Sequence, residues 1–284
     1  MKFSSLRCLL DSREDADFVC IMSEAPLGWL ALLYCYMNGI AISTMRCSRF
    51  DLHVGSVLGK HAAAFVDWSM DLFHSYSSVC ITPSMSMANF LRPRCPHVVG
   101  IHNGCNTQNF SPGGPMCAKM VDMERPIWLS VGRICREKNI TELLDLAKEG
   151  LLPGTVCVVG TGGDLEAYKR EYKNAETPVV FLGWKSGADL EAVYRSADVF
   201  VFTSRTDTFG NVMVEAMASG LPVAAHDVIG PQDIVTPVTG CLDECLLTAC
   251  AHALRMKDSS KCVAHAKSFS WDEMCMKFLR VQPE

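Results

Sequence analysis

The chain has 284 residues, of which 49% are hydrophobic and 20% charged, and its formal net charge is -5. These proportions exclude an intrinsically disordered chain, which combines few hydrophobic residues with a high net charge. The lysines and arginines are scattered rather than gathered into a basic stripe, so we expect no nucleic-acid partner.

The first half of the chain alternates short apolar runs with stretches of helical pattern, which predicts a small α/β unit with parallel strands. Strands are expected at residues 18–22, 40–44, 79–82 and 98–101, and helices near Pro26, Ser56 and Ser84. The most apolar stretch, residues 26–37, is too short to cross a bilayer and predicts a buried helix.

The start of the sequence and the cysteines bear on the compartment. The first residues, MKFSSLRCLLDSRED, lack the apolar core of a secretory signal. The 15 cysteines are odd in number, spread over the chain and without a C-x-x-C spacing, a pattern that favours reduced thiols over a disulfide framework. We therefore expect a cytoplasmic protein, and peripheral contact with a membrane stays open.

The second half shows the same alternation of apolar runs and helical stretches, with more strands. Short apolar runs at residues 127–131, 155–159, 179–182, 199–202 and 222–225 are typical of strands buried on both faces, and crossover helices between them make the strands parallel. This pattern predicts a doubly wound α/β domain whose ligand binds at the carboxyl ends of the strands.

The segment between the halves, NGCNTQNFSPGGPM, has the composition of an interdomain connection. We place a first domain at residues 1–112 and a second at residues 113–268. Residues 269–284 are expected to form a terminal helix, because SWDEMCMKFL puts its large apolar side chains on one helical face behind Ser270 as the N-cap.

Two cations flank the loop after the strand at residues 127–131. Gly132 and Arg133 follow that strand directly, and Lys138 precedes a helical stretch that starts at Ile140. A guanidinium grips two phosphate oxygens, an ammonium adds a point charge, and the helix start offers free N–H groups to an anion. The loop therefore suits a diphosphate, although the spacing leaves open that both cations are ordinary surface charges.

The next loop, Gly160-Thr161-Gly162-Gly163, follows the strand at residues 155–159 and precedes Asp164, an expected N-cap. Its glycines permit close approach of the backbone to a ligand, but a tight turn without a ligand explains them equally well. Leu165 stands where the dinucleotide-binding fingerprint requires its third glycine, so that motif is absent.

The third loop carries the most informative pattern. Asp207 stands just ahead of a helix at residues 212–218 and Glu215 lies within it, so both carboxylates are expected to face a ligand lying across the helix N-terminus. Carboxylates accept hydrogen bonds from sugar hydroxyls, and the N–H groups of residues 209–212 suit phosphate or sugar oxygens. An acid favoured by the helix dipole, with a Glu held in an ion pair, is the alternative.

Taken together and in this order, the three loops resemble the family 4 glycosyltransferases of the GT-B fold. The resemblance covers most of the chain and lies in LSVGRICREKNI, VVGTGGDLEAYKR, FLGWKSGADLEAVYRSADVFVFTSRTDTFGNVMVEAMASGLPVAA, GPQDIV with GCLDECL, SEAPLGWLA and IHNGCNTQNFSP. The chain looks most like the bacterial-type α-mannosyltransferases and, more distantly, the sulfoquinovosyltransferases. The resemblance implies an α/β protein with two Rossmann-like domains, each a doubly wound parallel sheet.

The resemblance also implies an activity. This is the retaining transfer of a hexose, mannose before others, from GDP-mannose or a UDP-sugar to a lipid or saccharide acceptor, as in glycolipid biosynthesis. Arg133 and Lys138 would contact the donor diphosphate and neutralise the leaving group, so no metal and no cofactor is expected. Asp207, in a position usually held by Glu, would contact the transferred sugar.

Further donor contacts are implied at other loop ends. Glu215 would bind the ribose, the segment around Trp184 and Lys185 would border the base, and backbone groups of residues 209–212 would touch sugar and phosphate. The residues expected to bind the nucleotide sugar are Gly132, Gly160, Thr161, Gly162, Trp184, Lys185, Phe209, Gly210, Asn211, Val212 and Glu215.

The chain departs from the family pattern in two ways. The family's first domain normally opens with further β-α units, so the first domain is expected to be incomplete. Cys47-Ser48-Arg49-Phe50 stands where the family often has His-Thr-Arg-Phe, and a thiol is a weaker hydrogen-bond partner than an imidazole. The alternative function is therefore a truncated or degenerate protein that binds a nucleotide sugar without transferring it.

Overall fold

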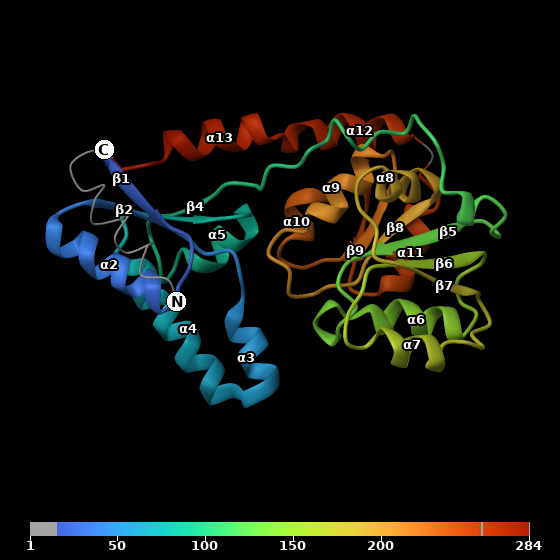
Figure 1. Ribbon diagram of the computed structural model, residues 1–284, viewed down its shortest axis with the longest axis horizontal. Helices are drawn as coiled ribbons and strands as arrows, with labels where there is room; N and C mark the ends of the chain where they lie inside the picture. Colours follow the sequence, from blue (N-terminus) through green and yellow to red (C-terminus); the bar gives the residue numbers. More distant parts are fainter. Residues whose placement is uncertain (1–15, 257, 284) are drawn as a thin grey trace. The chain divides into compact units, whose positions relative to one another are not determined.

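The computed structural model describes residues 16–256 and 258–283. Contacts between these residues divide them into two compact units. The first contains the described residues up to His102 together with those from Met274 onward, and the second is Asn103–Glu273. Figure 1 shows both units in colours that follow the sequence.

This division differs from the expected boundaries at residues 112/113 and 268/269 for two packing reasons. The amide of Cys105 donates to the carbonyl of Phe269 (2.8 Å), which ties the start of the connecting segment to the second unit. At the other end, Met274 and Phe278 pack against the core of the first sheet. The end of the terminal helix therefore belongs to the first unit.

The first unit is built around four parallel strands in the order β1-β2-β3-β4, as the sequence predicts. Apolar residues of α13 cover one face of this sheet, and those of α2 and α4 cover the other. The elements are β1 (Phe18–Ile21), α2 (Pro26–Asn38), β2 (Ala41–Met45), α3 (Phe50–Leu58), α4 (Lys60–Ser75), β3 (Val79–Thr82), α5 (Met85–Leu91), β4 (Val98–Gly100) and α13 (Trp271–Arg280).

Two expectations for the helices of this unit need correction. The helix expected near Ser56 is a pair of helices, because Gly59 (φ 86°) ends α3 and turns the chain directly into α4. Helix α2, expected to be buried, is buried only along the side of Leu32 and Cys35. Its other side is exposed, with Met37 at 70%.

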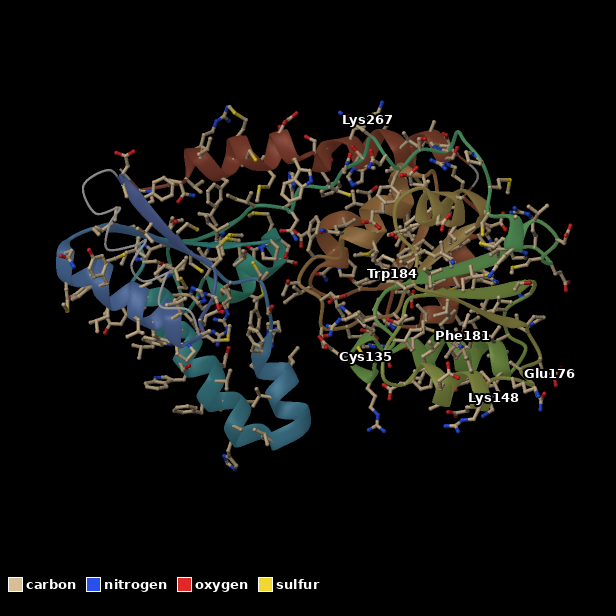
Figure 2. The ribbon with its side chains drawn as sticks, in the orientation of Figure 1. Cys135, Lys148, Glu176, Phe181, Trp184 and Lys267 are labelled. Atoms are coloured by element: carbon tan, nitrogen blue, oxygen red, sulfur yellow. The ribbon has the colours of Figure 1, made fainter. Side chains whose placement is uncertain are left out.

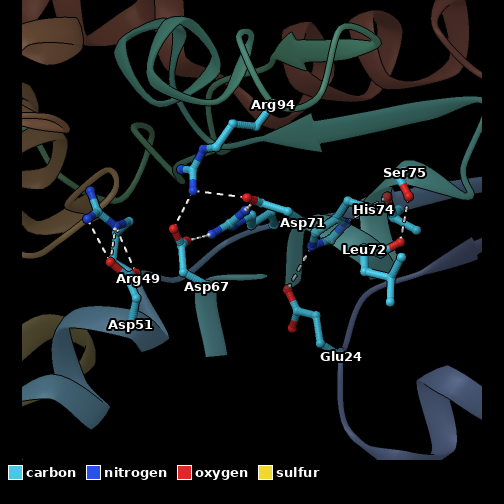
Figure 3. A network of polar contacts seen from close by, with 11 residues as sticks. Glu24, Arg49, Asp51, Asp67, Asp71, Leu72, His74, Ser75 and Arg94 are labelled. Atoms are coloured by element: carbon cyan, nitrogen blue, oxygen red, sulfur yellow. Dashed lines mark hydrogen bonds and ion pairs between the residues drawn. The ribbon is translucent and has the colours of Figure 1, made fainter. Parts of the chain in front are cut away.

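A buried arginine ties the first sheet to α4. Arg46 follows β2, is 1% exposed, and donates to Asp67 and Asp71 of α4 at 2.6 Å each. Arg94, after α5, pairs with the same two carboxylates, as Figure 3 shows. Taking a guanidinium out of water is costly unless its charge is paired, so these contacts hold α4 in place on the sheet.

The second unit is a six-stranded parallel sheet in the order β10-β9-β8-β5-β6-β7. Residues of α6, α7 and α11 build the core on one face, and residues of α8, α9 and α12 build it on the other, which confirms the predicted doubly wound architecture. The strands are β5 (Ile127–Val131), β6 (Thr155–Val159), β7 (Val179–Gly183), β8 (Val199–Phe202), β9 (Val223–His226) and β10 (Gly240–Asp243).

The helices of the second unit connect these strands. The α-helices are α6 (Ile140–Lys148), α7 (Leu165–Glu171), α8 (Gly187–Ser196), α9 (Asn211–Ala218), α10 (Pro231–Ile234), α11 (Leu246–Ala253) and α12 (Ser259–Ala266). Three short 3-10 helices are η1 (Ala118–Met120), η2 (Arg136–Lys138) and η3 (Lys267–Phe269). The sequence pattern did not predict β10, α10, α11 or α12.

The expected helix caps have mixed outcomes. Ser270 caps α13 as predicted, because its Oγ accepts from the amide of Glu273 (3.2 Å). Asp164 stands at the N-cap position of α7 as predicted, but its backbone is already helical (φ -91°, ψ -4°) and its side chain makes no capping hydrogen bond. None of the helices in residues 16–256 and 258–283 has the length and hydrophobicity that a bilayer crossing requires.

Candidate functional site

The second sheet reverses its strand order at β5, which pairs with β6 on one side and with β8 on the other. Connections leave such a switch point in opposite directions, and a crevice opens at the carboxyl ends of the two strands. A pocket of about 380 Å³ lies there, lined by Asn103, Ser130, Val131, Gly132, Arg133, Ile134, Lys138, Ile140, Val158, Phe202, Thr203, Ser204, Asp207, Thr208, Phe209, Gly210, Asn211 and Val212. Small-molecule sites fall in the same size range, about 300–1,000 Å³.

Lys138 and Asp207 face each other in this pocket. The Lys138 ammonium donates to the Asp207 carboxylate (Nζ to Oδ1, 2.5 Å), and each side chain is 22% exposed. Lys138 ends η2, whose turn is closed by the Lys138 amide donating to the carbonyl of Cys135 (3.0 Å). Lys138 and Asp207, two of the three predicted catalytic residues beside Arg133, therefore come from separate loops and meet as an ion pair, which the sequence did not predict.

Arg133 lines the same pocket but is held more loosely. Its side chain is 69% exposed and its Nη2 lies 3.4 Å from the carboxylate of Glu137. An exposed ion pair of this kind contributes little stability, so the guanidinium can turn toward an anion at small cost.

Helix α9 begins at the pocket. Gly210 (φ 110°) turns the chain from the loop after β8 into the helix, and the buried ring of Phe209 anchors the turn. The side-chain Nδ2 of Asn103 donates to the side-chain Oδ1 of Asn211 (3.4 Å). Since N–H groups at a helix start carry partial positive charge and suit an anion, this end of α9 adds to the field of the two cations.

Glu215 lies on α9 but outside the lining of the pocket. Its carboxylate accepts a hydrogen bond from the buried hydroxyl of Tyr194 on α8 (2.8 Å). Burial raises the pKa of Glu215, and the bond from Tyr194 lowers it in part; burial next to this carboxylate raises the pKa of Tyr194 well above its ordinary value. Of the two carboxylates expected to face one ligand, the structure therefore brings only Asp207 to the pocket.

Gly160 and Gly162 allow two loops to pack closely. A Cβ at Gly160 would lie 1.8 Å from the carbonyl oxygen of Gly132, and a Cβ at Gly162 would lie 1.8 Å from that of Ile134. The amide of Ile134 also donates to the carbonyl of Thr161 (2.9 Å). Loop packing thus accounts for these glycines, and residues 160–162 stand outside the pocket lining.

Trp184 and Lys185 follow β7 and also lie outside the pocket lining. The amide of Gly160 donates to the carbonyl of Gly183 (2.9 Å), which brings the loop after β7 next to the glycine loop. The Trp184 side chain, labelled in Figure 2, is 68% exposed. Such an indole offers an accessible face on which a planar ring can stack.

Some pocket residues were not predicted from the sequence. Ser130 at the end of β5, and Thr203, Ser204 and Thr208 in the segment between β8 and α9, also line the pocket. Their signal was present, because polar residues at the carboxyl end of a buried parallel strand lie where ligands bind. Asn103 had no such signal, since it stands in the connecting segment 108 residues from its partner on α9.

Sequence comparisons identify relatives of this chain. A model of the family described as glycosyl transferases group 1 matches residues 118–242, which lie within the second unit. A GDP-mannose-dependent alpha-mannosyltransferase of Mycobacterium tuberculosis is 31% identical over 229 residues, covering 78% of this chain and 58% of the relative. The sulfoquinovosyl transferase SQD2 of Arabidopsis thaliana is 40% identical over 114 residues, covering 39% of this chain and 21% of the relative. The chain thus spans less than two thirds of the length of these curated relatives.

Solved structures share the fold over nearly the whole chain. Anabaena Alr3699/HepE in complex with UDP superposes with a TM-score of 0.76 at 16% identity, covering 97% of this chain and 80% of that protein. Sucrose-phosphate synthase of Thermosynechococcus elongatus gives a TM-score of 0.76 at 21% identity, covering 98% of this chain and 76% of that protein.

Proposed function

The chain carries a glycosyltransferase group 1 domain in a GT-B fold, and from this premise we propose that it is a retaining glycosyltransferase that takes its donor sugar at the pocket between β5 and β8. The transferred sugar is a hexose, with mannose as the first candidate. The observation that carries the proposal is the set of charged groups that meet there: Lys138 and Arg133 beside the start of α9, with Asp207 opposite Lys138.

The diphosphate of the donor is assigned to the cationic side of this pocket. Arg133 is exposed and can turn toward two phosphate oxygens at once, while Lys138 supplies a compact charge that is already held in place. Negative charge grows on the diphosphate as the sugar leaves, and donors fixed in advance stabilise this charge without reorganising. The proposal therefore gives neither a metal nor a cofactor a role in departure of the leaving group.

The sugar and the nucleoside are assigned to the remaining groups. Asp207 accepts hydrogen bonds from hydroxyls of the transferred sugar, and the backbone of residues 209–212 contacts sugar and phosphate. Glu215 binds the ribose, which requires its carboxylate to exchange the bond from Tyr194 for a bond from a ribose hydroxyl, or to share both.

The base is assigned to the surface near Trp184, where an exposed indole can stack on either a purine or a pyrimidine. Relatives point to two donor classes: the mycobacterial one is GDP-mannose-dependent, and Alr3699/HepE was solved with UDP. We place GDP-mannose first, because the mycobacterial relative that matches 78% of this chain is GDP-mannose-dependent, and a UDP-sugar second.

The acceptor in this proposal is a lipid or a saccharide, as in glycolipid biosynthesis. A lipid acceptor would bring the chain into peripheral contact with a membrane surface from the cytoplasmic side. Cys47, exposed at the end of β2, offers no replacement for the imidazole that related enzymes often carry, so slow transfer at normal donor affinity would point to the first unit.

A thermal-shift panel with GDP-mannose, UDP-glucose, GDP and UDP tests the donor assignment. A ligand at a hundred times its dissociation constant adds about 2.7 kcal/mol of stability, so one nucleotide class should raise the melting temperature of the wild type. Arg133→Ala and Lys138→Ala should each reduce this rise clearly, because a tenfold loss of affinity already roughly halves the added stability. Lys169→Ala, which removes a cation paired with Glu166 on α7 outside the pocket, should leave the rise unchanged. Stabilisation that is as large in both pocket variants as in the wild type would contradict the assignment.

Turnover has to be measured separately from binding. Release of GDP or UDP from the bound donor, in the presence of lipid and saccharide acceptors, should follow the same dependence on Arg133 and Lys138. Tight donor binding without turnover would favour the second candidate, a protein that binds nucleotide sugars without transferring them.

A further inference from the structure

A carboxylate next to the pocket connects three separate elements. Glu142, in the first turn of α6, accepts a hydrogen bond from the side-chain amide of Asn139 (2.6 Å) and lies 2.9 Å from the Nε2 of His226 at the end of β9. Its second oxygen lies 3.5 Å from Arg205 in the loop after β8. We infer that Glu142 and His226 are positioning residues that hold the two loops carrying Lys138 and Asp207.

The contact with Asn139 acts on the loop after β5. Asn139 directly follows Lys138 and adopts a left-handed backbone (φ 51°), a conformation that few residue types other than glycine take readily. The hydroxyl of Thr203 donates to the carbonyl of Lys138 (2.6 Å). Thr203 thus holds the carbonyl of Lys138 and Glu142 holds the side chain of the next residue, Asn139. Both contacts restrain the chain on the C-terminal side of Lys138, and through it the direction in which its ammonium points.

The contact with Arg205 acts on the loop after β8. Arg205 stands two residues before Asp207, and its guanidinium is 48% exposed and reaches Glu142 across the gap between the loops. Because one carboxylate contacts both loops, the distance between Lys138 and Asp207 depends on Glu142 even though Glu142 touches neither side chain in the contacts of this site.

His226 explains why Glu142 stays in place. The imidazole is 0% exposed, and its Nδ1 has no hydrogen-bond partner among the described residues. The Nε2 proton therefore goes to Glu142, which is the one polar contact of this ring in the part of the chain that the structure describes. Loss of the ring would leave Glu142 with Asn139 and Arg205 as partners, and the ion pair with the half-exposed Arg205 holds only weakly.

This inference rests on the proposed donor site, so its first test is made without any donor. Hydrogen exchange of the ligand-free protein follows the amides of Lys138 and Asn139, which donate to the carbonyls of Cys135 and Arg136 (3.0 Å each). In Glu142→Met these amides should exchange at least about tenfold faster, the effect of losing one hydrogen bond to a charged group. Amides in the loop of Arg205 should respond in the same variant.

Two comparisons separate positioning from general destabilisation. Asp145→Asn, one turn further along α6, weakens a carboxylate that accepts from the hydroxyl of Tyr172 (2.7 Å) and does not reach the pocket loops, so its loop amides should exchange as in the wild type. His226→Gln keeps an N–H at the reach of Nε2 and should restore slow exchange, whereas His226→Met should match Glu142→Met.

The donor-dependent arm then titrates GDP and UDP into the same variants. The dissociation constant of the binding nucleotide should rise about tenfold in Glu142→Met and stay near the wild-type value in Asp145→Asn and His226→Gln. If the loop amides of Glu142→Met exchange at the same rate as those of Asp145→Asn, and the two variants bind the nucleotide with the same affinity, the inference is overturned. A different outcome is that the wild type binds neither GDP nor UDP while the loop amides still exchange faster in Glu142→Met. That outcome would overturn the proposed function and leave the positioning role standing.

Discussion

The substitution Asp207→Asn should raise the affinity of the protein for a free nucleoside diphosphate. In the ligand-free pocket the Lys138 ammonium is bound to the Asp207 carboxylate at 2.5 Å, so an incoming diphosphate competes with that carboxylate. Both side chains are 22% exposed, and ion pairs with this access to water contribute about 0.2–1 kcal/mol. Asp207→Asn should therefore lower the dissociation constant of GDP or UDP by about 1.4-fold to fivefold.

Two further measurements bracket this effect. Lys138→Ala should weaken the same nucleotide by about 10- to 150-fold, because it removes a hydrogen bond from a charged donor, about 1.5–3 kcal/mol. A nucleotide sugar should behave differently from the free nucleotide, since Asp207→Asn also weakens the proposed contact with the sugar. The gain seen with the nucleotide should then shrink or reverse for GDP-mannose.

Isothermal titration gives all of these constants under one set of conditions. The control is Glu166→Gln, which removes the carboxylate from the ion pair with Lys169 on α7, outside the pocket. It should leave every dissociation constant unchanged. If Asp207→Asn weakens the free nucleotide as much as it weakens the nucleotide sugar, Asp207 does not compete for Lys138 and the reasoning is refuted.

Three other predictions concern the fold around the site. Arg46→Met should lower the free energy of unfolding in urea by about 1.5–3 kcal/mol, because two acids lose the hydrogen bonds of a 1%-exposed guanidinium. Arg94 is 32% exposed on the same acids, so Arg94→Met should cost about 1 kcal/mol or less. Equal losses in the two variants would contradict the role given to burial. Burial raises the pKa of Glu215, so its ionised form destabilises the fold and Glu215→Gln should stabilise the protein at pH 7. This gain should vanish as the pH falls through the raised pKa toward the ordinary value of 4.5. A gain in stability that does not depend on pH would rule out the carboxylate as its source. Gly162→Ala should lower the free energy of unfolding by about 1–3 kcal/mol and weaken nucleotide binding, because its Cβ would lie 1.8 Å from a carbonyl oxygen. Gly163→Ala, with open space around its Cβ, should change neither quantity. Similar behaviour of the two variants would show that the loops can separate freely.

The strands and the site loops were predictable for the same physical reason. A parallel strand buried on both faces is a short, continuous apolar run, and such runs located nine of the ten strands found in residues 16–256 and 258–283. Once the strands are known, ligand-binding loops follow from the rule that they leave the carboxyl ends, which led to Arg133, Lys138 and Asp207.

Side-chain partners across the fold could not be predicted in this way. Glu215 was expected to face the ligand from its place on α9, but its orientation depends on the hydroxyl of Tyr194 from another helix, 21 residues away in sequence. His226 and Glu142 are 84 residues apart, and neither stands in a motif. Such pairs depend on how helices pack, and spacing along the chain carries no signal for them.

The structure of the protein with bound GDP, or with UDP if GDP does not bind, tests the central claim most directly. The account predicts that the nucleotide occupies the pocket between β5 and β8, with terminal phosphate oxygens within hydrogen-bond distance of Lys138 and Arg133 near the start of α9. A nucleotide bound elsewhere, or a pocket that stays empty at saturating concentrations of both nucleotides, would contradict the assignment of this pocket as a donor site.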